Sequence, residues 1–160
     1  DKFDIPLILK GIATAEDAAL SVEHGIDVVY ASNHGGRQLD HGRGGLDTLP
    51  EIVKAIDGKA EIIIDGGFMR GADVVKAMAM GANAVGLGRL QGMALGAKGR
   101  EGVVRMLELL ETEIQICLGL LGVTSFAELD ENYLHAVAPV EFPSPLSAFP
   151  LLFEDYLNED

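Results

Sequence analysis

Four short apolar runs, each followed by a stretch with helical spacing, constrain this chain more than any other feature of its sequence. The runs are almost continuously apolar, which is typical of strands buried on both faces of a parallel sheet. We expect strands at Ile5–Leu9, Val28–Ala31, Glu61–Ile64 and Ala84–Leu87, and helices at Ala15–His24, Asp47–Ile56 and Ala72–Met80. Gly25, Gly58 and Gly81 are placed to end these helices. The alternation predicts an α/β fold made of βα units.

The chain also repeats itself with a shift of 56 residues, which places Gly11 on Gly67 and Gly25 on Gly81. Two similar pairs of βα units favour a (β/α)8 TIM barrel, because a barrel repeats its unit around an axis. An open doubly wound sheet instead reverses direction at a switch point. We therefore expect residues 1–134 to form the C-terminal half of a TIM barrel.

Half a barrel leaves two open sheet edges and an uncovered core face. We expect the chain either to pair with another chain, with a homo-oligomer as one form of such pairing, or to be one piece of a longer polypeptide. The sequence has no initiator Met and opens almost directly on a predicted strand, which favours a piece of a longer protein.

The pattern changes after Arg89. A broad apolar helical face from Val103 to Leu121 predicts a long last helix, and a short capped turn follows in TSFAELD. Residues 135–160 form a tail rich in proline, apolar residues and acid, typical of an extended arm. Two interpretations of this tail stay open: it contacts a neighbouring subunit or domain, or it is disordered.

Composition and charge exclude several classes of protein. Twelve basic residues against 25 acidic ones give a net charge of −13, which argues against a nucleic-acid surface. There is no signal peptide and no apolar run of about 18 residues, so no membrane span is expected. The single cysteine, Cys117, excludes an internal disulfide and is expected to be a buried structural thiol. We expect a cytoplasmic protein without a metal site.

The residues that follow each apolar run are the candidates for chemistry, because barrel enzymes place their sites at the carboxyl ends of the strands. These residues are Lys10 and Gly11, Ser32 to Arg37, Asp65 to Gly67, and Gly88 with Arg89. Glycines there let a ligand approach the backbone, and their N–H groups can hold a phosphate. The segments DGG and GLGR are therefore candidate phosphate loops, although each is also an ordinary turn or strand end.

Three side chains stand out in this set. Lys10 follows LIL on a predicted buried strand, so it either pairs with an acid such as Asp65 or presents a fixed positive charge to a ligand. His34 can be a histidine that only satisfies the backbone. However, Arg37 follows with two glycines between them, and a base beside a guanidinium suits a substrate with a carboxylate and a removable proton.

The segments LILKG, SNHGGRQLD and DGG…RGADVVKAMAMGANAVGLGR, with the closing long helix, resemble the FMN-dependent 2-hydroxy acid oxidase and dehydrogenase family. The family includes glycolate oxidase, lactate oxidase, flavocytochrome b2 and mandelate dehydrogenase. The resemblance covers about Ile5 to Leu134, on the C-terminal half of the family's barrel.

The resemblance implies a role for each matching residue. His34 would be the active-site base that takes a proton from the 2-hydroxy acid, and Arg37 would hold the substrate carboxylate. The cofactor FMN would be bound by the residues at the other strand ends. Lys10 and Ser32 would lie at its ring, Asp65, Gly66 and Gly67 along its ribityl and phosphate part, and Gly88 and Arg89 at its phosphate.

Two positions depart from the family pattern. Met69 stands where the family usually has the first of two arginines after DGG, so one phosphate contact is lost or supplied by another residue, with Arg70 as a candidate. The alternative for Arg70 is a solvated residue at the start of a helix. Leu90 stands where proline is common, which affects the start of the last helix more than the chemistry.

The expected function is FMN-dependent oxidation of an L-2-hydroxy acid to the 2-oxo acid, with a companion N-terminal half of the same enzyme as partner. Without that half the chain is expected to be inactive. Two alternatives stay open: a half-barrel that binds FMN or another phosphate ligand without catalysis, and a structural half-barrel that assembles through its open edges. The sequence does not disclose which 2-hydroxy acid is used or which electron acceptor follows.

Overall fold

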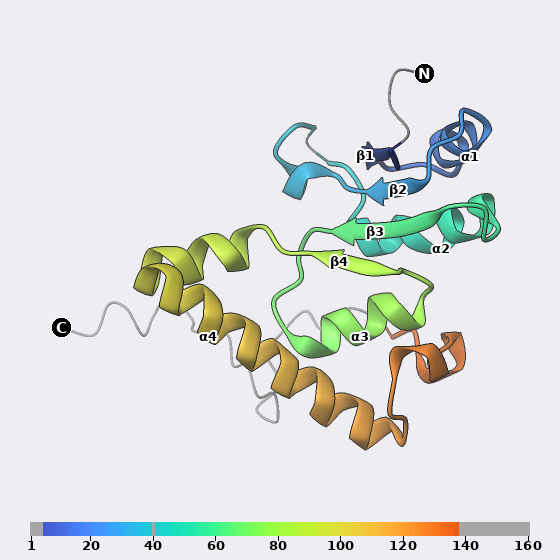
Figure 1. Ribbon diagram of the computed structural model, residues 1–160. Coiled ribbons are helices and arrows are strands. Elements are labelled where there is room, and N and C mark those ends of the chain that lie inside the picture. Colours follow the sequence, from blue (N-terminus) through green and yellow to red (C-terminus); the bar gives the residue numbers. More distant parts are fainter. Residues whose placement is uncertain (1–4, 40, 138–160) are drawn as a thin grey trace.

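The computed structural model describes residues 5–39 and 41–137. Within these ranges the chain forms one parallel sheet with the strand order β1-β2-β3-β4. The strands are β1 (Ile8–Ile12), β2 (Val28–Ala31), β3 (Glu61–Asp65) and β4 (Ala84–Gly86). Figure 1 shows the strands side by side, with the tips of β2, β3 and β4 pointing the same way. The predicted α/β fold class is therefore confirmed.

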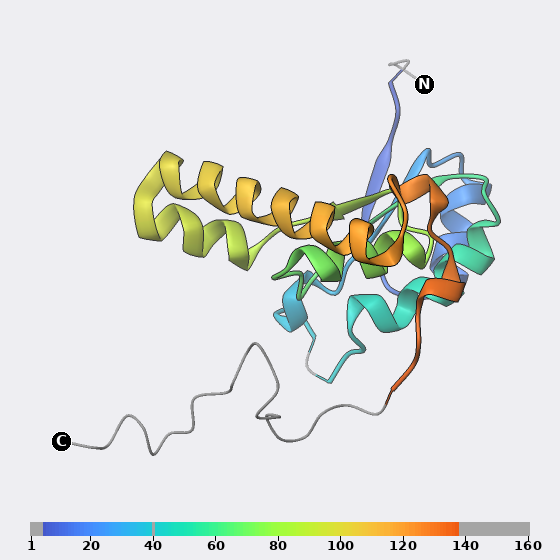
Figure 2. The same ribbon diagram turned by 90° about the horizontal axis from the view of Figure 1, so that it is seen from below.

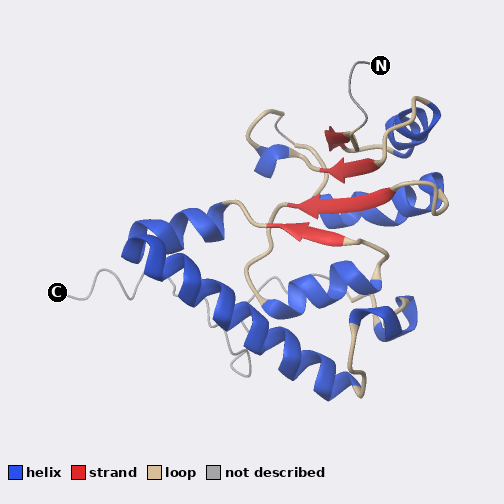
Figure 3. Cartoon of the chain, viewed as in Figure 1, coloured by secondary structure: helices blue, strands red, loops and turns tan. Residues whose placement is uncertain are grey.

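A helix follows each strand; the first three lie along the sheet and the fourth lies outside the third (Figure 3). They are α1 (Ala15–Glu23), α2 (Gly45–Ile56), α3 (Gly71–Ala79) and α4 (Arg89–Leu121). Helix α1 packs on α2, and α3 packs on α4. The Thr14 hydroxyl caps α1 by accepting from the Asp17 N–H at 3.2 Å.

The two faces of the sheet have different surroundings. Val29, Ala31, Ile62 and Ile64 point toward the helices and form the core with residues such as Leu49, Ile52 and Ile56. The alternate positions of β2 and β3 are only partly buried. They lie on the face that would be the inside of a barrel, because successive side chains of a strand point to opposite faces.

Strand β1 differs from the prediction, since it runs from Ile8 to Ile12 instead of Ile5 to Leu9. Pairing with β2 sets its position: Ile8 lies opposite Val28 and Lys10 opposite Tyr30. Pro6 has no N–H to give to a ladder, so the apolar run alone did not define the strand. The strand is also largely exposed instead of buried, because it lies at the edge of the described sheet.

Helix α4 is longer than the predicted Val103–Leu121 segment and contains a sharp break. Lys98 and Gly99 have non-helical backbone angles, and Gly99 has a φ of 55°. Figure 2 shows the two arms of α4 running back along each other from this break. Two short 3-10 turns follow, η2 (Phe126–Glu128) and η3 (Glu131–Tyr133).

The predicted capped turn in TSFAELD is η2. Glu128 accepts from the backbone N–H groups of Thr124 at 2.9 Å and Ser125 at 3.0 Å, and the bond from the Thr124 hydroxyl is the main cause that lowers the pKa of the Glu128 carboxyl. Of the predicted tail, residues 135–160, the part from 138 onward lies outside the described residues. Among residues 5–39 and 41–137 no helix combines the length and the apolar character needed to cross a membrane.

Candidate active site

A cavity of about 790 Å³ opens at the carboxyl ends of the strands. Every residue predicted to contact substrate or cofactor lines it, with the exception of Ser32: these are Lys10, His34, Arg37, Asp65, Gly66, Gly67, Gly88 and Arg89. Tertiary structure therefore brings together residues that lie far apart in the sequence. Gln38, Phe68, Met69, Gly86, Leu90 and Met93 also line the cavity.

Lys10 and Asp65 form an ion pair at the base of this cavity. The Lys10 Nζ lies 3.0 Å from Asp65 Oδ2 and donates to Ser32 Oγ at 2.8 Å. The Ser32 hydroxyl donates in turn to Asp65 Oδ1 at 2.5 Å. The two interpretations of Lys10 are therefore compatible, since the ammonium pairs with Asp65 and still faces the cavity.

Ser32 is 2% exposed, and its side chain lies beneath the cavity wall. Its oxygen also accepts the backbone N–H of His34 at 3.1 Å, which ties the turn that carries His34 to the Lys10–Asp65 pair. The structure thus places Ser32 as a link between the two groups.

Tyr30 is the fourth member of this network. Its ring lies under the Lys10 ammonium, 4.7 Å from Nζ to the ring centroid. Its hydroxyl lies on the same side as Asp65: a Cβ added at Gly86 would collide with this hydroxyl and lie 3.1 Å from Asp65 Cβ. Burial raises the pKa of the Tyr30 phenol, and the negative charge of Asp65 and hydrogen bonding to its side chain raise the pKa further. Tyr30 therefore stays a protonated donor at neutral pH.

His34 lies on η1 (His34–Gly36), a 3-10 turn directly after β2. The Asn33 side chain caps the turn by accepting from the Gly35 N–H at 3.0 Å. His34 itself has a φ of 55°, and its ring lies against Gly11, where an added Cβ would come within 3.0 Å of His34 Cε1. Gly11 is needed both for this contact and for its own φ of 107°.

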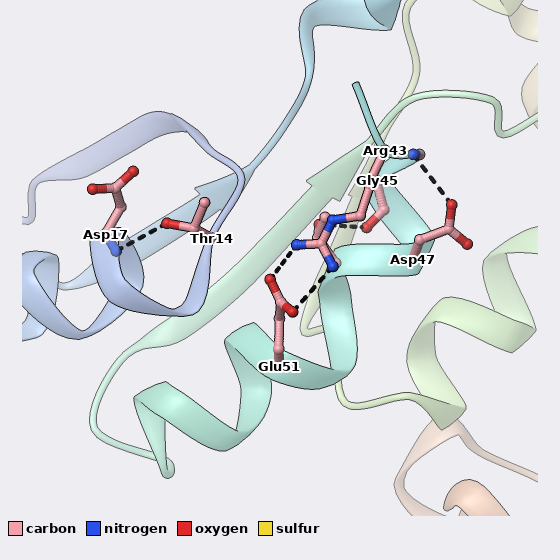
Figure 4. Close-up of polar contacts among 8 residues, drawn as sticks. Thr14, Asp17, Arg43, Gly45, Asp47 and Glu51 are labelled. Carbon is pink, nitrogen blue, oxygen red and sulfur yellow. Dashed lines mark hydrogen bonds and ion pairs between the residues drawn. The ribbon is translucent and has the colours of Figure 1, made fainter. Parts of the chain in front are cut away.

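Arg37 ends the turn and faces the same cavity as His34. The loop that follows is attached at Arg43: the Asn33 amide donates to the Arg43 carbonyl at 3.0 Å, and the Arg43 guanidinium forms a two-bond ion pair with Glu51 on α2. Figure 4 shows Arg43 pointing at the Glu51 carboxylate. The hydrogen bonds from Arg43 lower the pKa of Glu51. These contacts hold the segment that carries His34 and Arg37 against α2.

The DGG and GLGR segments also line the cavity. Gly66 and Gly67 have φ values of 102° and 82°, and Gly88 precedes the first residue of α4, which is Arg89. Around Gly67 and Gly88, a Cβ would meet no atom within 4 Å, so a ligand can approach the backbone at both positions. Arg89 extends over η1, with its guanidinium near Gly35.

Met69 stands at a position where the family usually has arginine, and Arg70 was the candidate to replace that contact. Met69 lines the cavity, whereas Arg70 is not among the lining residues. Arg70 forms an ion pair with Glu113 on α4, with Nε donating to Oε1 at 2.7 Å, and Glu113 also accepts the Gly71 N–H at 2.7 Å. Arg70 thus does not line the cavity, and its ion pair with Glu113 joins the start of α3 to α4.

The residues present fit FMN. The cavity is lined by the Lys10–Asp65 pair, by glycines of the DGG and GLGR segments and by Arg89, and backbone approach is open at Gly67 and Gly88. Such a lining suits a phosphate, because N–H groups beside glycines and a guanidinium are typical phosphate ligands.

Two residues of the site, Tyr30 and Gln38, were not among the candidates from the sequence. Gln38 directly follows the segment that was singled out, Ser32 to Arg37. Tyr30 is the one aromatic residue in the predicted second strand. Its inward direction depends on the strand register, which the sequence alone does not give.

Comparison with known proteins identifies the chain's relatives. The sequence model of the FMN-dependent dehydrogenase family matches residues 1–136. An L-lactate oxidase from Nostoc sp. is 47% identical over 133 residues, which are 82% of this chain and 36% of that protein. A 2-hydroxyacid oxidase 2 from Mus musculus is 45% identical over 130 residues, which are 81% of this chain and 37% of that protein.

Solved structures agree with these relatives. A mandelate oxidase aligns with a TM-score of 0.76 and 46% identity, over 78% of this chain and 36% of that chain. A mandelate oxidase variant solved with a monooxide FMN adduct aligns with the same TM-score and identity. The likeness identifies the four-stranded sheet as part of a (β/α)8 barrel, as expected.

The matched part of the chain spans just over a third of the length of these relatives. Its strand order, its cavity and its sequence all lead to the same conclusion. The chain belongs to the FMN-dependent 2-hydroxy acid oxidase and dehydrogenase family.

Proposed function

We propose that this chain is the C-terminal part of an enzyme that binds FMN and oxidises an L-2-hydroxy acid to the 2-oxo acid. The observation that carries the proposal is the shared cavity: His34, Arg37, Lys10 and the DGG and GLGR segments line one space at the strand ends. The relatives are oxidases of lactate and other 2-hydroxy acids by name, which supports the same substrate class.

Each side chain has a defined task in this proposal. FMN, when bound, supplies the acceptor for the two electrons that leave the substrate. Arg37 holds the substrate carboxylate through a bidentate contact, and an imidazole nitrogen of His34 accepts the proton that leaves the substrate. Lys10 and Ser32 support the ring end of the cofactor, Asp65, Gly66 and Gly67 its ribityl and phosphate part, and Gly88 and Arg89 its phosphate.

The turn geometry supports these tasks. His34 and Arg37 lie at the two ends of η1, which Asn33 caps and Ser32 binds to the Lys10–Asp65 pair. A base and a guanidinium held by one rigid turn fix the substrate between proton acceptor and carboxylate clamp, which lowers the entropic part of the barrier.

The proposal includes a companion segment of the same enzyme, homo-oligomeric assembly and a cytoplasmic location. The open edges at β1 and β4 support a companion segment, because an unpaired strand edge is ordinarily covered. Low cysteine content supports a reducing compartment.

The test uses the full-length enzyme that contains this chain. Purified enzyme should be yellow, and L-lactate or another 2-hydroxy acid should bleach its FMN without oxygen. His34→Ala should slow bleaching by a factor on the order of 10³ or more while FMN stays bound, because only the base is removed. Unchanged bleaching would refute the role of His34.

Arg37→Lys is the matched variant for the substrate site. It keeps the charge but loses the bidentate geometry, so we expect KM for the 2-hydroxy acid to rise more than kcat falls. Flavin colour without any bleaching by a panel of 2-hydroxy acids would favour the non-catalytic binding module, and absence of flavin would favour the structural half-barrel.

A further inference from the structure

We propose that Tyr30 is a positioning residue of this site, which fixes the Asp65–Lys10 pair and so sets where the Lys10 charge lies in the cavity. This inference rests on the proposed function, since it concerns the charge that FMN would meet. It comes from four residues on four successive strands: Lys10, Tyr30, Asp65 and Gly86.

The position of the Lys10 ammonium is set by its neighbours. A lysine has a flexible four-carbon stem, so its ammonium position depends on its partners. Here Nζ has three: Ser32 Oγ at 2.8 Å, Asp65 Oδ2 at 3.0 Å and the Tyr30 ring at 4.7 Å. The Lys10 side chain is still 39% exposed, and it lines the cavity.

Asp65 is the acidic partner of Lys10. Its carboxylate binds the Lys10 ammonium and accepts from the Ser32 hydroxyl, and the Tyr30 hydroxyl lies on the same side, where a Cβ at Gly86 would meet both Tyr30 and Asp65. A donor on this carboxylate takes up part of its negative charge, which leaves more of the Lys10 charge directed at the cavity. Tyr30 is suited to this task because its raised phenol pKa keeps the proton in place at neutral pH.

The Tyr30 side chain occupies the space beside Gly86 that a larger residue would need. A Cβ at Gly86 would collide with the Tyr30 hydroxyl oxygen and would lie 3.1 Å from Asp65 Cβ. Gly86 does not have a positive φ, so lack of space, and not backbone conformation, requires glycine there. Tyr30 reaches past β3 to β4 over a residue without a side chain, and the two positions form a matched pair.

The consequence concerns the electron affinity of a bound flavin. When Tyr30→Phe removes the donor, Asp65 keeps more of its charge, and the net positive field in the cavity falls. The reduced, negatively charged ring is then less stabilised. We expect the flavin midpoint potential to fall and FMN to bind about three- to tenfold more weakly, the range for loss of one hydrogen bond.

The experiment is a double-mutant cycle in the full-length FMN enzyme. The variants are Tyr30→Phe, Gly86→Ala and the double variant, and the two readouts are the FMN dissociation constant by fluorescence quenching and the midpoint potential by dye equilibration. Gly86→Ala should weaken FMN binding about tenfold when Tyr30 is present but less than about threefold in the Tyr30→Phe background, because the colliding oxygen is then gone.

The matched controls are Tyr133→Phe on η3 and Gly92→Ala on α4, where a Cβ meets nothing within 4 Å. Both should leave the two readouts unchanged. If Gly86→Ala fails to fold, its recovery in the Tyr30→Phe background supports the pair, and failure in both backgrounds overturns it.

The outcomes separate this inference from the proposed function. If the parent enzyme binds FMN and a 2-hydroxy acid bleaches it, but Tyr30→Phe leaves both readouts unchanged, only the role of Tyr30 is overturned. Equal effects of Gly86→Ala in the two backgrounds also overturn it. A parent enzyme that binds no flavin overturns the proposed function together with this inference.

Discussion

Ser32 joins the base to the charge pair through a single oxygen atom. It accepts from Lys10 and from the His34 N–H, and it donates to Asp65, while the residue is almost fully buried. Because Ser32 is buried, water cannot take the place of its hydroxyl. Removal of the hydroxyl would therefore leave Lys10, Asp65 and the His34 N–H each without one hydrogen-bond partner.

Ser32→Ala should therefore lower the free energy of unfolding by about 1–3 kcal/mol and weaken FMN binding. Urea unfolding and fluorescence titration measure the two effects. Ser21→Ala is the matched control: Ser21 is similarly buried, but its hydroxyl donates only to the Asp17 carbonyl within the same helix, at 2.7 Å. A loss for Ser21→Ala as large as for Ser32→Ala would contradict the special position of Ser32.

The residues that contact ligand were predictable to a large extent, because they follow apolar runs and strand ends meet at one edge of a parallel sheet. Lys10, His34 and Arg37 were found in this way, and all three line the cavity. The orientation of Tyr30 and the burial of Ser32 were not, since both depend on the register between β2 and its neighbours. A pattern of apolar residues fixes which face is buried but not which cross-strand pairs meet.

At the scale of elements, helices α3 and α4 are joined by one carboxylate. Glu113 on α4 binds both the Arg70 guanidinium and the Gly71 N–H at the start of α3. These bonds, with the Arg70 charge, lower the pKa of the Glu113 carboxyl. Its folded pKa lies below the unfolded value, so its contribution to stability is present above the unfolded pKa and is lost as the pH falls through the folded one.

Glu113→Gln should lower the free energy of unfolding at pH 7 by about 1 kcal/mol, at the low end for a charge-assisted bond because the Arg70 side chain is 42% exposed. Urea unfolding at a series of pH values should show the difference shrinking below about pH 4. Glu108→Gln, which breaks an ion pair whose two members are both more than half exposed, should change little. If the difference in unfolding free energy between the parent and Glu113→Gln stays constant down to about pH 3, the ionised Glu113 carboxylate is not the source of the stabilisation.

The elements themselves were predictable from alternating apolar runs, helical spacing and glycine stops, and the ends of β2, β3 and the first three helices differ by at most two residues from expectation. Strand β1 was displaced because its ladder with β2, and not its own apolar run, sets its register. The break in α4 was missed because Lys98 and Gly99 interrupt a segment whose other residues are compatible with a helix.

At the scale of the whole molecule, the sheet ends in two unpaired strands, β1 and β4, within the described part of the chain. The β1 edge carries Ile5, Leu7, Ile8 and Leu9 in exposed positions. An edge that is long and apolar pairs readily with another chain. The repeat of 56 residues made such edges predictable, since half of a closed barrel must have two.

The chain produced alone should therefore self-associate, and Ile8→Lys should shift it toward the monomer, because a charge at 51% exposure on an edge opposes pairing. Sedimentation velocity at several concentrations measures this. In the full-length enzyme the same substitution should instead lower stability, since the proposed barrel covers this edge. Unchanged association of the Ile8→Lys chain would show that another surface is responsible.

The network of Lys10, Tyr30, Asp65 and Gly86 has a consequence for the order of folding events. Each member comes from a different strand, so no pair of adjacent βα units contains the whole set. Contacts between residues far apart in sequence form late, because closing the intervening loops costs entropy before the contacts repay it. Helices and single βα units can form early in such a chain, but the cavity acquires its oriented positive charge only when the fourth strand has joined the sheet.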